Sequence, residues 1–198
     1  MINIPQGLDF FIEDHTREVC DFYLKLLETK NKEIYTHSCQ VANYATGIAA
    51  KLGMNTKEIG CIKMSALMHD IGMLAVPNLI LDKFPYLSLR ENAQYKRHAA
   101  AGAAMLENLP EFGNIISIIR SHHECWDGSG YPKHLKGANI PIGARIIAVA
   151  NYYDRFLNPA ISKYSGDKER AAKELQDKMG ILFDPDVVKA FLSIIVKE

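Results

Sequence analysis

Apolar residues recur at three- and four-residue steps along most of the chain. Over residues 33–52 they form one continuous stripe that ends before Gly53, a common helix terminator. The stripe contains Ile34, His37, Val41, Tyr44, Ala45, Ile48 and Leu52. Residues 8–29 show the same periodicity. No convincing strand alternation and no repeat is found, so the pattern predicts an all-α fold.

Two capping-box sequences predict where further helices begin. Asn55–Glu58 opens a helix that runs to His69-Asp70, and Ser88–Glu91 opens a helix that carries His98. The prolines of the segment from Pro77 to Pro85 predict a loop between these helices. The first helix therefore ends at His69-Asp70, and the second carries His98 near Tyr95 and Ala101.

The second half of the chain continues in the same way. Ile115, Ile119 and His122 share a helix face, so a helix brings the pair His122-His123 to its end. The glycines of Asp127–Gly130 then favour a turn that is flexible enough to fold over a ligand. Three more helices are predicted, over residues 141–151, 167–179 and 184–196.

Length and charge limit the possible functions. A chain of 198 residues with 48% apolar content fits one domain, with 1–30 as an N-terminal helical extension and 31–198 as the core. Lys and Arg together number 23, as do Asp and Glu, so no bulk charge favours DNA or an anionic membrane. The N-terminal helix could pack on the domain or form a homodimer, and a signalling protein partner stays possible.

The four cysteines indicate a reducing compartment. Cys20, Cys39, Cys61 and Cys125 show no CxxC spacing, and no signal peptide or long apolar span accompanies them. We therefore expect free thiols and a cytoplasmic location.

The histidines carry the candidate chemistry. Five of them lie within or at the ends of apolar helical stretches: His37, His69, His98, His122 and His123. One histidine on an apolar face is more often a satisfied core residue. Five together, one beside Asp70, favour a metal site because imidazole and carboxylate groups can share divalent ions. Glu33, one helical turn before His37, could reach the same ion or be a solvated first-turn glutamate.

Four motifs extend this pattern: His37-Ser38, His69-Asp70-Ile71-Gly72, Arg97-His98, and the run His-His-Glu-Cys-Trp-Asp-Gly-Ser-Gly-Tyr-Pro over 122–132. They resemble the HD-GYP subgroup of the HD phosphohydrolases, whose members hydrolyse cyclic di-GMP. Weaker matches continue through 144–150 and 183–185, so the resemblance extends from about residue 26 onward. It implies a helical bundle of the HD phosphohydrolase type with a GYP loop and additional C-terminal helices.

The resemblance also implies two or three divalent ions, with iron or manganese preferred and zinc possible. Asp70 would bridge two ions, and Glu33 would serve a third. The remaining ligands divide into His37, His69 and Asn151 for one ion, and His98, His122 and His123 for the other. The implied reaction is hydrolysis of cyclic di-GMP, or a related nucleotide, to the linear dinucleotide or GMP by a metal-bridging water, with Asp70 and His69 as catalytic residues.

The GYP loop would border the substrate. Tyr131, between Gly130 and Pro132, could hydrogen-bond or stack on the nucleotide, or could simply pack the loop. Lys163 and Arg145 are further candidate substrate-binding residues. Arg145 could equally pair with a loop carboxylate.

Three positions depart from the family pattern. Met73 and Ala160 stand where active relatives carry a lysine and an arginine, and Asn151 stands in place of an aspartate, whereas Asp154 and Lys163 are kept. Each ~1.4 kcal/mol of lost transition-state stabilisation slows turnover tenfold. Two hypotheses follow: a metal-dependent phosphodiesterase, or a catalytically weak or inactive module that binds a cyclic dinucleotide or a protein partner.

Overall fold

The described residues fold into α-helices and short 3₁₀ helices joined by turns. The computed structural model describes residues 14–158 and 166–195, and in these ranges no strand occurs beyond an isolated bridge between Met179 and Phe183. The all-α prediction is confirmed. The elements are α1 (Asp14–Lys30), α2 (Lys32–Lys51), α3 (Thr56–Met68), η1 (Ile71–Ala75), α4 (Asn78–Leu81), α5 (Leu89–Lys96), α6 (His98–Met105), η2 (Pro110–Phe112), α7 (Gly113–Ser121), η3 (Gly137–Asn139), α8 (Ile142–Leu157), α9 (Lys168–Asp177) and α10 (Pro185–Ile195).

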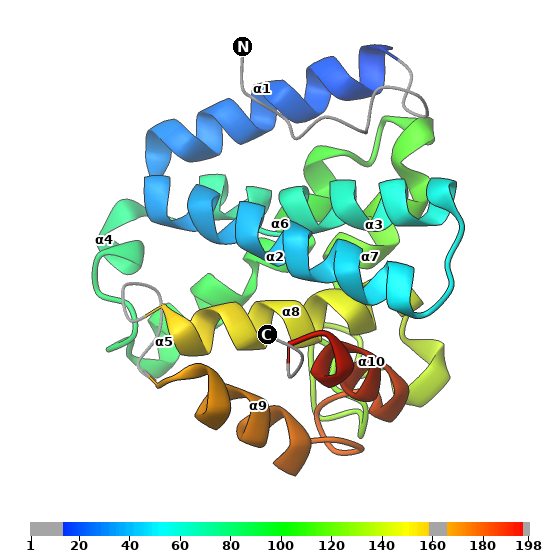
Figure 1. Cartoon of the computed structure of the whole chain (residues 1–198). Helices are drawn as coiled ribbons and strands as arrows, with labels where there is room; N and C mark the ends of the chain where they lie inside the picture. The colour runs from blue at the N-terminus through cyan, green and yellow to red at the C-terminus, as the bar shows by residue number, and fades with distance from the viewer. Residues whose placement is uncertain (1–13, 159–165, 196–198) are drawn as a thin grey trace.

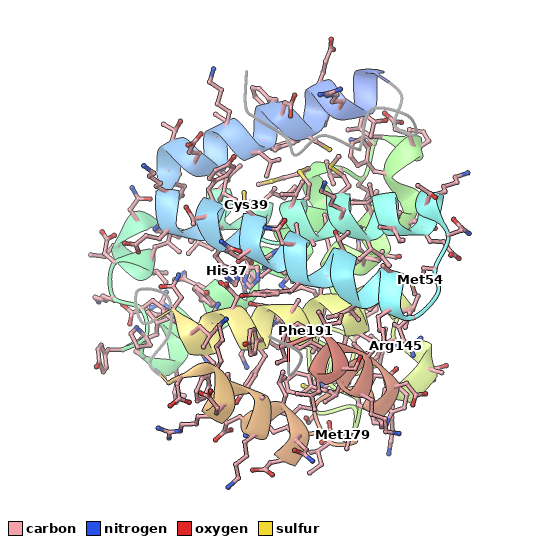
Figure 2. All side chains as sticks on the ribbon, in the orientation of Figure 1. His37, Cys39, Met54, Arg145, Met179 and Phe191 are labelled. Atoms are coloured by element: carbon pink, nitrogen blue, oxygen red, sulfur yellow. The ribbon has the colours of Figure 1, made fainter. Side chains whose placement is uncertain are left out.

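Helix α2 lies at the centre of the arrangement. It packs against α1, α3, α8 and α10, and α9 covers the side of α8 that faces away from α1 (Figure 1). The stripe predicted from the sequence is the buried face of α2, where Val41, Ala45 and Ile48 are fully buried. Where α10 packs against α8, Phe191, which is labelled in Figure 2, contacts Tyr153, with ring centroids 4.9 Å apart.

Both predicted capping boxes are present. The Asn55 side chain accepts from the Glu58 N–H at 3.0 Å, and the Glu58 carboxylate accepts from the Asn55 N–H at 2.9 Å. Ser88 and Glu91 form the same reciprocal pair at the start of α5. These caps set where α3 and α5 begin and therefore where their C-terminal ends deliver His69 and His98.

Two predicted elements differ in the structure. The helix expected to carry His98 is broken at Arg97, where α5 ends and α6 begins. The break frees the Tyr95 carbonyl, which accepts a hydrogen bond from the His98 ring at 2.7 Å. The loop expected from Pro77 to Pro85 contains the single helical turn α4, which buries Ile80.

A second apolar cluster lies beside the main core and joins α1, α2, η1, α4 and α5. Its buried members are Leu27, Ile34, Met73, Val76, Ile80 and Tyr95. At its edge, the Lys30 ammonium donates to the carbonyls of Leu74 and Val76, at 2.9 and 2.7 Å. The end of α1 thus holds η1, the segment that directly follows Asp70.

Segment η1 lies directly on α6. A Cβ atom at Gly72 would fall 1.9 Å from the His98 carbonyl oxygen and 2.5 Å from the Gly102 nitrogen, so only glycine fits there. Gly102 lies in the same contact, where a Cβ atom would fall 3.0 Å from the Gly72 nitrogen. This contact brings Asp70 beside His98.

Helix α1 is part of the packed structure on one face only. It buries Cys20 and Leu24 in the main core, whereas Phe22 and Leu26 are 59% and 41% exposed. The separation of 1–30 from 31–198 stays a prediction, and residues 8–13 lie outside the described ranges. None of the described helices combines the length and apolar character needed to cross a membrane.

We expect Gly72→Ala to lower the free energy of unfolding by about 3 kcal/mol, because the new methyl group meets backbone atoms that cannot rotate away. Chemical denaturation followed by circular dichroism measures the change. Gly113→Ala is the matched control, since a Cβ there meets nothing within 4 Å and its φ is −48°. We expect that control to be neutral or to stabilise by up to about 1 kcal/mol. Equal stability of the two variants would contradict the close approach.

Candidate metal centre

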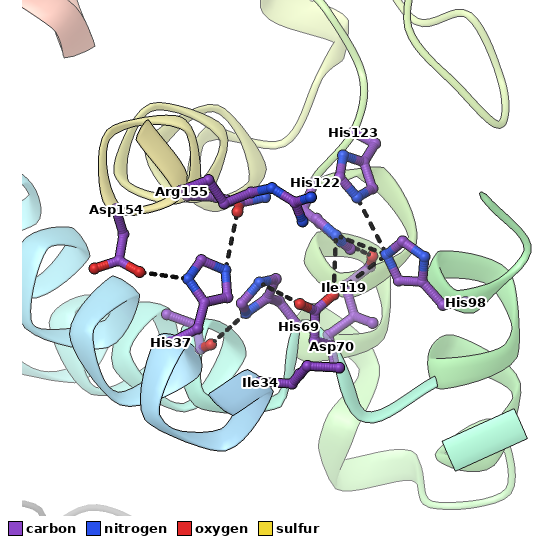
Figure 3. Close-up of polar contacts among 12 residues, drawn as sticks. Ile34, His37, His69, Asp70, His98, Ile119, His122, His123, Asp154 and Arg155 are labelled. Atoms are coloured by element: carbon purple, nitrogen blue, oxygen red, sulfur yellow. Dashed lines mark hydrogen bonds and ion pairs between the residues drawn. The ribbon is translucent and has the colours of Figure 1, made fainter. Parts of the chain in front are cut away.

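Six predicted ligands gather between α2, α3, η1, α6, α7 and α8 (Figure 3). They form two groups, and within each group one ligand atom per residue lies within 4.8 Å of the others. The groups are His37, His69 and Asp70, and His98, His122 and His123. This division agrees with the one that the family resemblance implies.

The Asp70 carboxylate joins the two groups. One oxygen lies 3.3 Å from His69 Nε2, and the other lies 3.3 Å from His98 Nε2 and 3.9 Å from His122 Nε2. Asp70 is 3% exposed, so these nitrogens replace water as its neighbours. A carboxylate with one oxygen toward each group is suited to bridge two ions.

Three histidines share one device that sets the direction of the ring. His69 and His122 lie at the C-terminal ends of α3 and α7, and His98 follows the end of α5 as the first residue of α6. Each donates an Nδ1–H to the carbonyl three residues earlier, at 2.7 Å; the acceptors are Ala66, Tyr95 and Ile119. The last carbonyls of a helix lack intrahelical partners, so the bond satisfies both groups. With Nδ1 protonated, Nε2 keeps its lone pair and faces the centre. Helix C-termini also carry partial negative charge, which favours cations.

His37 comes instead from within α2 and reaches the same centre between α2 and α8 (Figure 2). Its Nδ1 lies 2.5 Å from an Asp154 carboxylate oxygen, and its Nε2 lies 3.0 Å from the Asn151 amide oxygen. Because the Nδ1–H donates to Asp154, the Nε2 lone pair faces an oxygen lone pair of Asn151. A cation held by both atoms would satisfy them.

The remaining acceptors also fit bound cations. His69 Nε2 is buried and has no hydrogen-bond partner. The Nε2 atoms of His98 and His122 lie 3.4 Å apart although both rings use Nδ1–H elsewhere, so two lone pairs face each other. Buried acceptors without partners are costly. The nitrogen and oxygen donors present here therefore match divalent transition metals.

Electrostatics keeps Asp70, His122 and His123 in the forms that bind metal, whereas the pKa of His69 is raised, because the opposing effect of burial is outweighed by the attraction of Asp70. Burial opposes ionisation of Asp70, yet attraction to His69, His98 and His122 holds its pKa well below the usual range. Burial, followed by the neighbouring imidazoles, holds the pKa values of His122 and His123 well below the usual range. Asp70 is thus an anion and these two rings are neutral.

Glu33 borders the centre without joining either group. It lines a cavity of about 60 Å³ together with His37, Asp70, Tyr95 and Arg155. That space accommodates an ion and a few water molecules. The Glu33 side chain is exposed at the rim of the cavity, so its role as a ligand of a third ion stays a prediction.

The GYP loop covers the second group. The Tyr131 ring stacks on His123, with centroids 4.8 Å apart, and the Lys96 ammonium lies 4.9 Å from the centre of the Tyr131 ring. A Cβ at Gly130 would fall 2.3 Å from the Cys125 nitrogen, so the close return of the loop requires glycine. Pro132 is exposed beside Tyr131.

Glu124 holds this loop and was not identified from the sequence. It is 3% exposed, and its two carboxylate oxygens accept the N–H groups of Lys133 and Leu135 at 2.7 and 3.0 Å. On the other side, the Trp126 and Asp127 N–H groups donate to carbonyls of the α9–α10 connection. The loop expected to be flexible is therefore anchored at several points.

Arg145 lies away from the centre. Its guanidinium pairs with Asp184 at 2.6 Å and donates to the Ile140 carbonyl at 2.9 Å. It lies near the start of α8, roughly 15 Å along the helix from Arg155 at ~1.5 Å per residue. The sequence allowed two roles for Arg145, contact with substrate or pairing with a carboxylate, and the structure has the pairing. The predicted contact of Arg145 with substrate has no support here. Lys163 and Ala160 lie outside the described residues.

Met73 and Arg155 also affect the chemistry expected at the centre. Met73, in the position of the family lysine, is 1% exposed and belongs to the second apolar cluster. Arg155, which the sequence analysis did not identify, lies four residues after Asn151 and therefore on the same face of α8. Helical spacing from Asn151 was the available signal.

We expect Mn²⁺ to stabilise the wild-type protein by about 2.7 kcal/mol at an ion concentration 100-fold above its Kd, because only the folded chain assembles the ligands. Asp70→Ala removes the shared ligand and should abolish most of this gain. Chemical denaturation with and without Mn²⁺, together with elemental analysis, provides the measurement. Asp177→Ala, which removes an exposed carboxylate from α9, should behave as wild type. A full gain in Asp70→Ala would refute the site.

Asn151→Asp should tighten Mn²⁺ binding by about tenfold, because it replaces a neutral oxygen ligand with an anion next to His37. Isothermal titration calorimetry measures the affinity. Asn114→Asp, at an exposed position on α7, controls for the added charge. Unchanged or weaker binding in Asn151→Asp would show that position 151 does not contact the ion.

Comparisons with known proteins show the family to which the chain belongs. The model of the HD domain family matches residues 22–187. A cyclic di-GMP phosphodiesterase of Thermotoga maritima is 35% identical over 190 residues, which cover 94% of this chain and 52% of the relative. A 3′3′-cGAMP-specific phosphodiesterase of Vibrio cholerae is 31% identical over 183 residues, covering 91% of this chain and 35% of the relative.

A solved structure supports the same fold. Bd1817, an HDGYP protein from Bdellovibrio bacteriovorus, matches with a TM-score of 0.70 at 24% identity, covering 98% of this chain and 66% of that one. The chain spans about half or less of the two relatives' own length. The chain belongs to the HD domain family, and the resemblance to its HD-GYP group is confirmed.

Proposed function

We propose that this chain hydrolyses a phosphodiester bond of a cyclic dinucleotide, with cyclic di-GMP as the first candidate. The observation that carries the proposal is the placement of Asp70, whose two oxygens face separate groups of histidines. Relatives named for cyclic di-GMP and 3′3′-cGAMP hydrolysis support the substrate class. Because these relatives are named for different nucleotides, experiment must decide which nucleotide this chain hydrolyses.

The ligand groups would hold two divalent ions, with iron or manganese preferred, zinc possible and Glu33 available to a third. Bound ions of this kind neutralise phosphate charge and lower the pKa of water, which supplies a nucleophile at neutral pH. Asp70 stays ionised between the groups, and Asp154 orients the His37 ring. His69 Nε2 has no hydrogen-bond partner and lies 3.3 Å from an Asp70 oxygen.

The GYP loop supplies the proposed contact with the nucleotide. Tyr131 lies against His123, so a phosphate bound at the second group would lie close to the phenol ring. The cavity beside Asp70 is too small for a whole dinucleotide. The bases of a bound dinucleotide would therefore lie outside this cavity.

A second candidate function is binding without rapid turnover. It is favoured by Met73, which places a thioether in the apolar cluster where the family carries a lysine, and by Asn151, which adds no negative charge. Such a module would respond to a cyclic dinucleotide by contacting a protein partner or a second copy through the exposed face of α1.

We expect protein purified without oxygen to contain close to two or three ions per chain and to convert cyclic di-GMP to the linear dinucleotide or GMP, followed by chromatography. Chelation should abolish turnover, and Fe²⁺ or Mn²⁺ should restore it. Asp70→Ala should lower kcat by at least about 1,000-fold, because it removes a ligand shared by both groups. Asp177→Ala is the matched surface control.

The result separates the two candidates. Tight binding of cyclic di-GMP and 3′3′-cGAMP by the metal-loaded protein, without product, would establish the binding module. Absence of both metal and nucleotide binding would refute both functions.

A further inference from the structure

We propose that Arg155 binds a non-bridging phosphate oxygen of the substrate at the junction of the two ligand groups. This inference rests on the proposed function and names a specific phosphate-binding residue for it. Neither the motifs nor the ligand set assigns a role to Arg155.

The first support is position. Arg155 lines the cavity that contains His37 and Asp70, and it also lines a second cavity, of about 210 Å³, that contains His122, His123 and Asn151. Figure 3 shows its side chain extending from α8 above Asp70 toward the second group of histidines. A group between the two cavities can reach a phosphate held by either set of ligands.

The second support is the set of partners of its guanidinium. Nη1 donates to the Tyr95 hydroxyl at 3.3 Å, and the guanidinium lies 5.0 Å from the Phe84 ring centre. Among residues 14–158 and 166–195, no carboxylate forms an ion pair with it. Its other N–H groups have no hydrogen-bond acceptor among those residues. A guanidinium has five donors in a planar fork, a geometry that matches phosphate oxygens.

The third support is charge balance. Among the described residues, the carboxylates that contact or border the two ligand groups are those of Asp70, Asp154, Glu33 and Glu124. Four negative charges would not neutralise two divalent ions plus Arg155, which together carry five positive charges, and Asn151 adds no anion. The loaded centre therefore carries excess positive charge, which favours a phosphodiester anion and disfavours a neutral ligand.

Arg155 could instead have only a structural role, tying Phe84 and Tyr95 to α8. Tyr95→Phe removes the hydroxyl partner and keeps both the guanidinium and the backbone carbonyl that orients His98. Tyr95→Phe therefore distinguishes a role of Arg155 in anchoring Tyr95 from a role of Arg155 in binding phosphate.

The test compares Mn²⁺-loaded wild type with Arg155→Gln, Arg155→Lys, Tyr95→Phe and Arg120→Gln, after elemental analysis shows equal metal content. Arg120 is a partly exposed arginine paired with Glu107 on the surface. Calorimetry with inorganic phosphate, and steady-state kinetics with bis(p-nitrophenyl) phosphate, provide two readouts. We expect Arg155→Gln to weaken phosphate binding and raise KM by at least about tenfold. Arg155→Lys should retain part of the affinity, and Arg120→Gln should match wild type.

Equal losses in Tyr95→Phe and Arg155→Gln, or unchanged phosphate affinity in Arg155→Gln, would overturn the inference. If Arg155→Gln loses metal or stability, chemical modification of the wild-type protein tests the inference instead. Phosphate should slow the modification of Arg155 by phenylglyoxal, followed by peptide mass spectrometry, and should leave Arg120 unaffected. No protection at saturating phosphate would also overturn it.

The outcome is distinguishable from failure of the proposed function. If the wild type turns over no cyclic dinucleotide yet binds phosphate through Arg155, the proposed function fails and the inference stands. If the wild type hydrolyses cyclic di-GMP and Arg155→Gln matches it in KM and phosphate affinity, the inference alone fails.

Discussion

The centre depends on one hydrogen bond that the chain uses three times. His69, His98 and His122 each donate Nδ1–H to a carbonyl left free at a helix end, and each ring thereby presents an Nε2 lone pair to a shared point. The same bond satisfies the helix terminus and fixes the histidine tautomer. Helix packing therefore determines ligand geometry, because a shift of any of these helix ends would move a ligand.

The close packing around Asp70 follows from this requirement. Gly72 lets η1 lie on α6, and Lys30 holds the far end of η1, so Asp70 meets His98 across a contact that excludes any larger side chain. The site combines a buried anion with the neutral imidazoles of His122 and His123, an arrangement suited to cations. Arg155 adds a positive charge at the same place, and that charge makes the centre suitable for an anionic ligand once the ions are bound.

Much of this organisation is local and could be predicted from the sequence. Capping boxes at Asn55 and Ser88 set two helix starts, and apolar periodicity placed the histidines at buried positions. Periodicity did not reveal the break at Arg97 or the role of Glu124, whose partners are N–H groups of the loop. The spacing of Arg155 from Asn151 gives its helix face, but its partner Tyr95 is 60 residues away in sequence. Arg145 lies near a recognisable motif but does not reach the centre. Its partner, Asp184, is 39 residues away in sequence and holds the guanidinium far from the centre.

We expect Asp70 to be shared by two ions, each held by its own group of histidines. Anomalous scattering from crystals loaded with Mn²⁺ tests this arrangement most directly. Two peaks about 3.5–4 Å apart, one on each side of the Asp70 carboxylate, are the predicted result. No peak at Asp70, or a single peak that leaves either group of histidines without an ion, would contradict it.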